Sequence, residues 1–288
     1  MDTRCAVRVV AVAVLLAAVF FLGAPSAGAQ GLCVPGQCQD FCVPGGTPTD
    51  TDCPEGKWIH RVCTPELENI NGGLVVFAHG YVAPDEPLDV PDYTIDGIPL
   101  SALVTQEGFV YATSSLPRNG LAIQEGIADL ENLGATVRDI CGLPGPILLA
   151  GASEGGAITA LAVERSHVFG GGLALCGPIG SFQKQINHYG DFRVVFDYFF
   201  PGVLPGTAID PDPTGGVRAN WDGYGGYAYQ IGRALQSNLT AAAQLLKVLR
   251  VPVDPEGPVT SVGEAVVGNL WYNVFGTYDA QTTLGGQP

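Results

Sequence analysis

Residues 146–160 read PILLAGASEGGAITA, and this stretch decides the fold. Its short apolar run, residues 147–150, indicates a buried strand. Residues 151–155 (GASEG) then predict a sharp turn, and the Ala- and Leu-rich residues 157–165 predict a helix. The order is therefore a strand, a tight turn with Ser153 in its middle, and a helix.

The glycines around Ser153 indicate what the turn is for. A serine hydroxyl is a poor nucleophile, so it must be displayed where a base can reach it and where N–H groups can stabilise the oxyanion that its attack creates. Gly151 and Gly155 stand at i−2 and i+2, where a side chain would block so tight a turn. The pattern G-x-S-x-G between a strand and a helix is a nucleophile elbow. Ser153 is the candidate nucleophile, and an ordinary glycine-rich turn is the alternative.

A second motif, LVVFAHGY at residues 74–81, predicts a strand that ends in a His-Gly turn. With both motifs, the segment from about Lys57 to Gly180 resembles the α/β-hydrolases over a little under half of the chain. The resemblance implies that the backbone N–H groups of Tyr81 and Glu154 form the oxyanion hole beside Ser153. It also implies that His79 is not the general base. For the Glu154 side chain, we expect a solvated carboxylate rather than one that tunes the charge of the site.

The residues themselves also predict an α/β fold. Residues 120–140 repeat apolar side chains at roughly helical spacing, with Glu and Asp between them, and they lie between two of five short apolar runs. Such alternation is typical of βαβ units, so we predict a mostly parallel sheet with helices on both faces. The polar residues 113–120 are expected to form a loop near the mouth of the site, facing either water or substrate. The predicted strands are residues 58–62, 74–78, 109–113, 147–150 and 172–176.

The N-terminus predicts export. Residues 1–29 combine Arg4 and Arg8, an apolar stretch and an Ala-Gly-Ala cleavage site, which together indicate a secretory signal peptide; an uncleaved membrane anchor is the alternative. The chain has 288 residues, of which 47% are hydrophobic and 14% charged, enough for a sizeable core. Its formal net charge of −15 repels phosphate backbones, so nucleic acid is excluded as a partner. We expect a secreted protein with no stable membrane insertion.

The cysteines agree with an oxidising compartment. Five of the seven beyond the signal lie between Cys33 and Cys63, so residues 30–56 are predicted to be a loop-rich segment held by disulfides, with open connectivity. A zinc site is the alternative, but the spacings lack paired C-x-x-C units. Because seven is odd, one thiol is expected to stay unpaired, and Cys176 in an apolar run is predicted to be that buried free cysteine. The seven are Cys33, Cys38, Cys42, Cys53, Cys63, Cys141 and Cys176.

Residues 181–288 differ in composition from the predicted hydrolase core at residues 57–180. They mix aromatic residues with Pro and Gly, and residues 227–251 predict one amphipathic helix. In α/β-hydrolases a cap over the nucleophile is commonly inserted after the strand that corresponds to residues 172–176. The aromatic residues of such a cap either line a site for an apolar acyl or alcohol group or pack the cap's own core.

The remaining members of a catalytic triad are not evident. An α/β-hydrolase carries its acid and then its histidine after the serine, yet only His167 and His188 follow Ser153. His167 is expected at the far end of the helix after the elbow. His188 begins the predicted cap, with Asp191 as its nearest carboxylate in sequence, and is the candidate base. Because no triad-bearing strand follows the cap helix, we expect a C-terminally truncated member of the family.

The sequence therefore favours a secreted serine hydrolase of carboxylic ester type that acts on a small ester. A serine peptidase of the same fold is the alternative among enzymes, and a truncated or non-catalytic secreted binding protein is the alternative outside them. No cofactor is expected, because no G-x-G-x-x-G follows a strand and no P-loop occurs, and no metal site is expected either.

Overall fold

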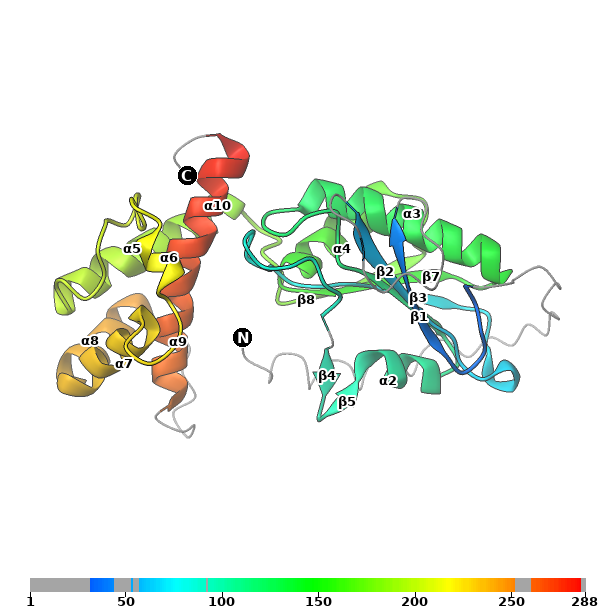
Figure 1. Ribbon diagram of the computed structural model, residues 1–288, viewed down its shortest axis with the longest axis horizontal. Helices are drawn as coiled ribbons and strands as arrows, with labels where there is room; N and C mark the ends of the chain where they lie inside the picture. Colours follow the sequence, from blue (N-terminus) through cyan, green and yellow to red (C-terminus); the bar gives the residue numbers. More distant parts are fainter. Residues whose placement is uncertain (1–31, 44–52, 54–56, 92, 252–259, 286–288) are drawn as a thin grey trace. The chain divides into compact units, whose positions relative to one another are not determined.

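The computed structural model describes residues 32–43, 53, 57–91, 93–251 and 260–285 (Figure 1). It divides into two compact units, Asp2–Ile179 and Gly180–Pro288. The predicted signal peptide, residues 1–29, lies outside the described residues. Among the helices of the described residues, none is long and apolar enough to cross a membrane.

The first unit contains a six-stranded sheet in the order β1-β2-β6-β3-β7-β8. Strands β6, β3, β7 and β8 run parallel, whereas β2 is antiparallel to β6 and β1 is antiparallel to β2. All five predicted strands are present close to their expected bounds. The strands are β1 (Cys38–Val43), β2 (Trp58–Cys63), β3 (Leu74–Ala78), β6 (Val110–Ser114), β7 (Ile147–Ala152) and β8 (Gly171–Leu175).

Helices cover both faces of this sheet (Figure 1). Helices α3 (Ile123–Cys141) and α4 (Glu154–Arg165) lie on one face, and α2 (Leu100–Gln106) lies on the other. A short helix, η2 (Leu67–Asn69), precedes β3, and a small hairpin of β4 (Thr94–Ile95) and β5 (Ile98–Pro99) precedes α2. The predicted α/β class, with its mostly parallel sheet, is confirmed.

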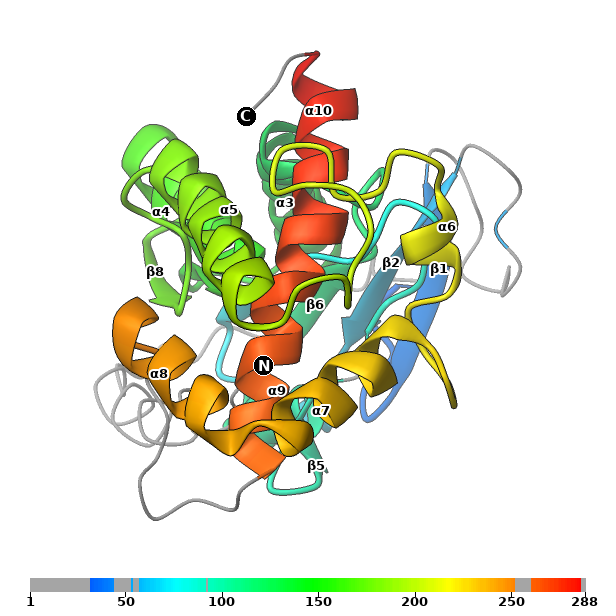
Figure 2. The same ribbon diagram turned by 90° about the vertical axis from the view of Figure 1, so that its left-hand side faces the viewer.

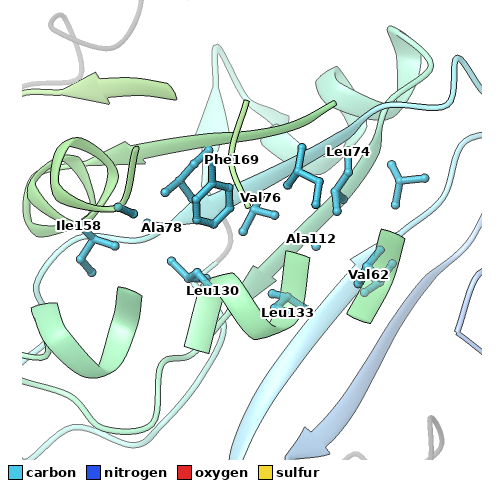
Figure 3. Packing of buried hydrophobic residues seen from close by; sticks show 14 of the residues in the cluster. Val62, Leu74, Val76, Ala78, Ala112, Leu130, Leu133, Ile158 and Phe169 are labelled. Carbon is cyan, nitrogen blue, oxygen red and sulfur yellow. The ribbon is translucent and has the colours of Figure 1, made fainter. Parts of the chain in front are cut away.

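Alternation along the strands builds the two layers of the core, because successive side chains of a strand point to opposite faces. Leu74, Val76 and Ala78 of β3 are buried against α3 and α4, together with Leu130 and other apolar residues (Figure 3). The intervening Phe77 belongs to a smaller cluster on the α2 side. This alternation fixes the register of β3 and therefore the position of the turn that follows it.

The cysteine-rich segment differs from the predicted loop, because β1 is a full edge strand of the sheet. The strand is joined to the sheet by backbone pairing with β2, and two disulfides of the segment reach residues beyond it. Cys33 is bonded to Cys141 at the end of α3, a sequence separation of 108 residues. The other disulfides described are Cys38–Cys63, between paired residues of β1 and β2, and Cys42–Cys53.

The prediction that Cys176 is a buried free thiol is wrong. Cys176 is exposed and disulfide-bonded, and no free cysteine occurs among the described residues. The apolar run misled the prediction because β8 ends at Leu175, and Cys176 lies in the turn beyond it with a φ of 50°.

Within its described residues, the second unit consists of helices and connecting loops (Figure 2). The predicted helix over residues 227–251 is two helices, because Asn238 leaves the helical conformation and its side chain accepts a hydrogen bond from the Ala241 N–H, 3.0 Å away. Of the aromatic residues, Phe192, Phe196 and Trp221 are buried within the unit, whereas Tyr198 and Tyr224 are exposed. The elements are α5 (Phe182–Phe199), α6 (Gly216–Ala219), α7 (Tyr227–Ser237), α8 (Leu239–Leu249), α9 (Thr260–Trp271), the π-helix η3 (Tyr272–Gly276) and α10 (Thr277–Leu284).

Candidate active site

Ser153 lies between the end of β7 and the start of α4 with φ 57° and ψ −120°. A non-glycine residue rarely adopts this conformation, which persists only where the surrounding structure enforces it. The Ser153 N–H donates to the Leu175 carbonyl at 2.9 Å, and the Ser153 carbonyl accepts from the N–H groups of Gly156 and Ala157. The strand, the next strand and the helix therefore all hold the serine backbone in place.

The elbow glycines are required by close backbone approach. A Cβ on Gly151 would overlap the Gly155 carbonyl, and a Cβ on Gly155 would overlap the carbonyl of Ala78 at the end of β3. Gly156 is similarly close to β8, since its Cβ would lie 2.7 Å from the Leu175 carbonyl oxygen. The steric reason given from the sequence for the two flanking glycines is confirmed.

The His-Gly turn lies next to the elbow. Ala78 pairs with Gly151 in the parallel register of β3 and β7, so the turn that follows β3 reaches the same edge of the sheet as Ser153. A Cβ on Gly80 would lie 3.3 Å from the Ser153 Cβ. The sequence motifs at residues 79–81 and 151–155 are thus adjacent in space, which is the arrangement that an oxyanion hole formed by Tyr81 and Glu154 requires.

The Glu154 side chain is not solvated as expected. It is buried, and its Oε1 accepts a hydrogen bond at 2.7 Å from the backbone N–H of Ala122, the residue that caps the N-terminus of α3. A carboxylate is favourable there because unpaired N–H groups give the start of a helix a partial positive charge. Glu154 therefore connects the elbow to α3 through its side chain.

Tyr93 is a neighbour of the site that the sequence reasoning missed. Its hydroxyl accepts a hydrogen bond from the Gly80 N–H at 3.1 Å, and its ring contacts Phe77 edge-on. Burial raises the pKa of the Tyr93 hydroxyl, although the hydrogen bond from Gly80 opposes that shift. No sequence signal marks this tyrosine, because it lies in a loop with neither strand nor helix periodicity.

The side chains of residues at the end of β6 form hydrogen bonds with backbone groups rather than facing water or substrate. Thr113, Ser114 and Ser115 are buried. The Thr113 hydroxyl donates to the Phe77 carbonyl, and the Ser114 hydroxyl accepts from the N–H of Leu116. The expectation that these polar residues are solvent-facing is wrong, since they satisfy backbone groups where β3 and β6 end and where β2 begins.

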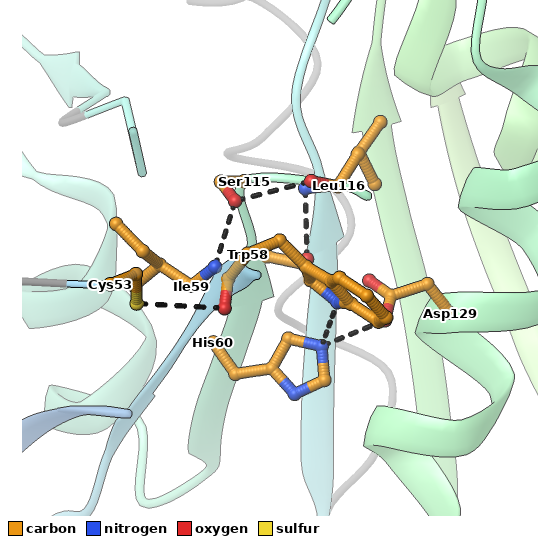
Figure 4. A network of polar contacts seen from close by, with 8 residues as sticks. Cys53, Trp58, Ile59, His60, Ser115, Leu116 and Asp129 are labelled. Atoms are coloured by element: carbon orange, nitrogen blue, oxygen red, sulfur yellow. Dashed lines mark hydrogen bonds and ion pairs between the residues drawn. The ribbon is translucent and has the colours of Figure 1, made fainter. Parts of the chain in front are cut away.

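Among the hydrogen bonds described, none joins a histidine of the first unit to Ser153. His79 is buried, and its Nδ1 lies 2.6 Å from the Gly80 carbonyl oxygen, so this nitrogen carries a proton and donates it. His167 is exposed beyond the C-terminus of α4, at the other end of that helix from Ser153. His60 forms a buried pair with Asp129 of α3 at 2.8 Å (Figure 4), but β6 and β3 separate its strand β2 from β7.

His188, the candidate base, lies on α5 in the second unit. Its Nε2 is 3.2 Å from Oδ1 of Asn269, and its ring contacts Tyr189 and Phe192 edge-on. The partner recorded for its ring nitrogen is thus an amide of α9, rather than Asp191, the carboxylate nearest in sequence. A role for His188 at Ser153 stays a prediction.

No group of three or more His, Cys, Asp or Glu residues that could hold a metal ion occurs among the residues that the structure describes. No protein-family model matches the chain, and a search of curated proteins gives no significant match.

Several solved hydrolases resemble the chain. An acylaminoacyl peptidase from Pyrococcus horikoshii is 15% identical over 53% of this chain and 24% of its own, with a TM-score of 0.36. Tannin acyl hydrolase from Aspergillus niger is 13% identical over 63% of this chain and 35% of its own, with a TM-score of 0.37. A proline iminopeptidase from Mycobacterium smegmatis is 16% identical over 76% of this chain and 67% of its own, with a TM-score of 0.36. The chain spans 24%, 20% and 44% of the first three structures matched.

The fold is that of the α/β-hydrolases. Its features in this chain are the mostly parallel sheet and the serine elbow between β7 and α4.

Proposed function

We propose that this protein is a secreted serine hydrolase that cleaves carboxylic esters by acyl transfer through Ser153. The observation that carries the proposal is the backbone of Ser153, held at φ 57° and ψ −120° by three backbone hydrogen bonds. Strain of this kind gathers at functional sites. A serine that only completed a turn would adopt a relaxed conformation or be replaced by glycine.

In the proposed reaction, the Ser153 Oγ attacks the ester carbonyl carbon while a base removes the hydroxyl proton. The N–H groups of Tyr81 and Glu154 stabilise the negative charge that develops on the carbonyl oxygen, and the N-terminus of α4 adds a favourable partial positive charge. The base then returns the proton to the departing alcohol. Water releases the acyl group from Ser153 by the same steps in reverse.

His188 is the proposed base, and its contacts support one tautomer. The Asn269 Nδ2 donates to the Ala265 carbonyl at 2.8 Å, which directs Oδ1 of the same amide toward His188. An amide oxygen only accepts hydrogen bonds, so Nε2 of His188 carries the proton. Its Nδ1 is then the nitrogen that can accept a proton, and Asn269 holds the ring through Nε2.

The test is hydrolysis of a short-chain nitrophenyl ester by the full chain. Ser153→Ala should abolish turnover, whereas Ser101→Ala, a matched change on α2, should leave it unchanged. His188→Ala should lower kcat by about 10²-fold or more, as loss of a general base does. Equal turnover by Ser153→Ala and the unmodified chain would contradict the proposal. A peptide nitroanilide in the same assay distinguishes a peptidase from an esterase.

Export is part of the proposal. The three disulfides described are stable in oxidising compartments. Expression of the full chain in a secreting host should release protein whose N-terminus begins near Gln30, and retention of residues 1–29 would contradict cleavage.

A non-catalytic secreted binding protein of the same fold is the second candidate. The observation that favours it is that the buried histidine–carboxylate contact of the first unit, His60 with Asp129, does not belong to the elbow. Under this alternative, the folded chain shows no Ser153-dependent turnover of either substrate.

A further inference from the structure

The hydroxyl of Tyr93 lies close to the proposed nucleophile. The position that a Cβ on Gly80 would take is 3.3 Å from the Ser153 Cβ and 3.7 Å from the Tyr93 hydroxyl oxygen. The serine and the phenol therefore converge on the same side of the Gly80 backbone. This glycine leaves open the space between them that any side chain would fill.

The hydrogen bond with Gly80 determines whether the Tyr93 hydroxyl can still donate a hydrogen bond. The Gly80 N–H is the donor at 3.1 Å, so the Tyr93 oxygen is the acceptor and its own proton is not used in that contact. Burial raises the pKa of this hydroxyl, so the proton stays on the oxygen through neutral and mildly alkaline pH. Tyr93 therefore retains one O–H donor beside Ser153.

The phenol is also held in place. Its ring packs against Phe77, with centroids 5.2 Å apart, and lies against the cluster on the α2 side of the sheet. The Tyr93 carbonyl accepts from the N–H of Leu100 at the start of α2 at 2.8 Å. A donor fixed in this way needs little reorganisation during a reaction, which is the requirement for stabilising a transition state.

We propose that the Tyr93 hydroxyl is a third oxyanion donor, which hydrogen-bonds the substrate oxygen that becomes negatively charged when Ser153 attacks. The inference rests on the proposed function. No proton leaves Tyr93: the O–H bond persists, and the negative charge is dispersed over the phenol and the two backbone N–H groups. The ligand that it recognises is an acyl carbonyl, or the phosphoryl oxygen of an organophosphorus inhibitor.

A purely structural role predicts different behaviour, because Tyr93 would then matter only as the acceptor that steadies Gly80. Fluorination of the ring separates the two roles, since it makes a phenol a stronger hydrogen-bond donor, a weaker acceptor and a stronger acid. The experiment compares the unmodified chain, Tyr93→Phe and a chain with 3-fluorotyrosine at position 93. Fluorotyrosine at Tyr229, an exposed residue of α7, is the incorporation control.

The readout is the second-order rate constant for labelling of Ser153 by a fluorophosphonate, measured from pH 6 to pH 10. Tyr93→Phe should label about 10²-fold more slowly, the usual effect of losing one oxyanion donor. At pH 7 the 3-fluorotyrosine chain should label at least as fast as the unmodified chain. Its rate relative to the unmodified chain should fall at alkaline pH, where its more acidic phenol loses the donated proton first.

Two results would overturn this role while leaving the proposed function intact. One is a Tyr93→Phe rate equal to that of the unmodified chain. The other is a 3-fluorotyrosine rate reduced at pH 7 as much as that of Tyr93→Phe, which would show that only the acceptor matters. If the unmodified, folded chain shows no labelling at Ser153, the proposed function fails and the role of Tyr93 fails with it.

Discussion

Replacement of Asp129 by alanine tests how α3 is held to strand β2 of the first unit. Oδ1 of Asp129 accepts from Nε1 of Trp58 at 2.7 Å and lies 2.8 Å from Nε2 of His60 (Figure 4). A carboxylate oxygen only accepts, so Nε1 of Trp58 and Nε2 of His60 both direct protons at this atom; the two nitrogens also lie 3.2 Å from each other. The side chains of His60 and Asp129 are 4% and 2% exposed, so water does not readily replace the carboxylate.

The magnitude follows from the two donors that Asp129→Ala would deprive of their carboxylate acceptor. A buried donor without an acceptor costs about 1–3 kcal/mol. His60 is fully enclosed and Trp58 only partly, so we expect a total loss of about 3 kcal/mol in the free energy of unfolding. For a domain of this size, that loss lowers the Tm by roughly 10 °C.

The assay is thermal unfolding followed by circular dichroism, with Asp139→Ala as the matched control. Asp139 lies on the same helix, but its side chain is 68% exposed and pairs only with its neighbour Arg138 among the ion pairs described. The control should change the stability by no more than about 0.5 kcal/mol. A Tm for Asp129→Ala equal to that of the control would refute the reasoning that this buried contact stabilises the fold.

Three further predictions concern the elbow and its supports. Gly155→Ala should abolish Ser153-dependent ester turnover, because the new Cβ meets backbone that cannot move aside; Gly190→Ala, where a Cβ would meet nothing within 4 Å, is the control. Glu154→Ala should lower the free energy of unfolding in urea by about 1–2 kcal/mol through loss of a helix cap, and unchanged stability would show that its hydrogen bond contributes nothing. Serine at both Cys33 and Cys141 should cost about 5 kcal/mol by the chain-entropy estimate for a loop of this length; a Tm equal to that of the bonded chain would contradict that estimate.

Local sequence patterns were enough to predict strand β3 and the serine elbow. The run at residues 74–78 is buried from both sides, so its apolar character marked β3 without any knowledge of its partners. The elbow was also predictable, because the backbone approach around Gly151 and Gly155 excludes every side chain at those positions. Both features leave a pattern in residues that are close in sequence, although the backbone that excludes a Cβ at Gly155 belongs to Ala78 of β3.

The parts that were missed depend on partners distant in sequence. The burial of Glu154 follows from a hydrogen bond to Ala122, and the cysteine pairing follows from the approach of residue 33 to the end of α3. Tyr93 became a candidate only because its loop brings a hydroxyl back to Gly80. Strand β1 was hidden by the compositional bias of the cysteine-rich segment, although its pairing with β2 is regular.

The most direct test of the central claim is to treat the intact chain with a fluorophosphonate and locate the adduct by peptide mass spectrometry. We expect one adduct, on the peptide that contains Ser153, which is absent from Ser153→Ala and retained in Ser101→Ala. A chain that unfolds cooperatively on heating, and so is folded, yet carries no adduct on Ser153 would contradict it.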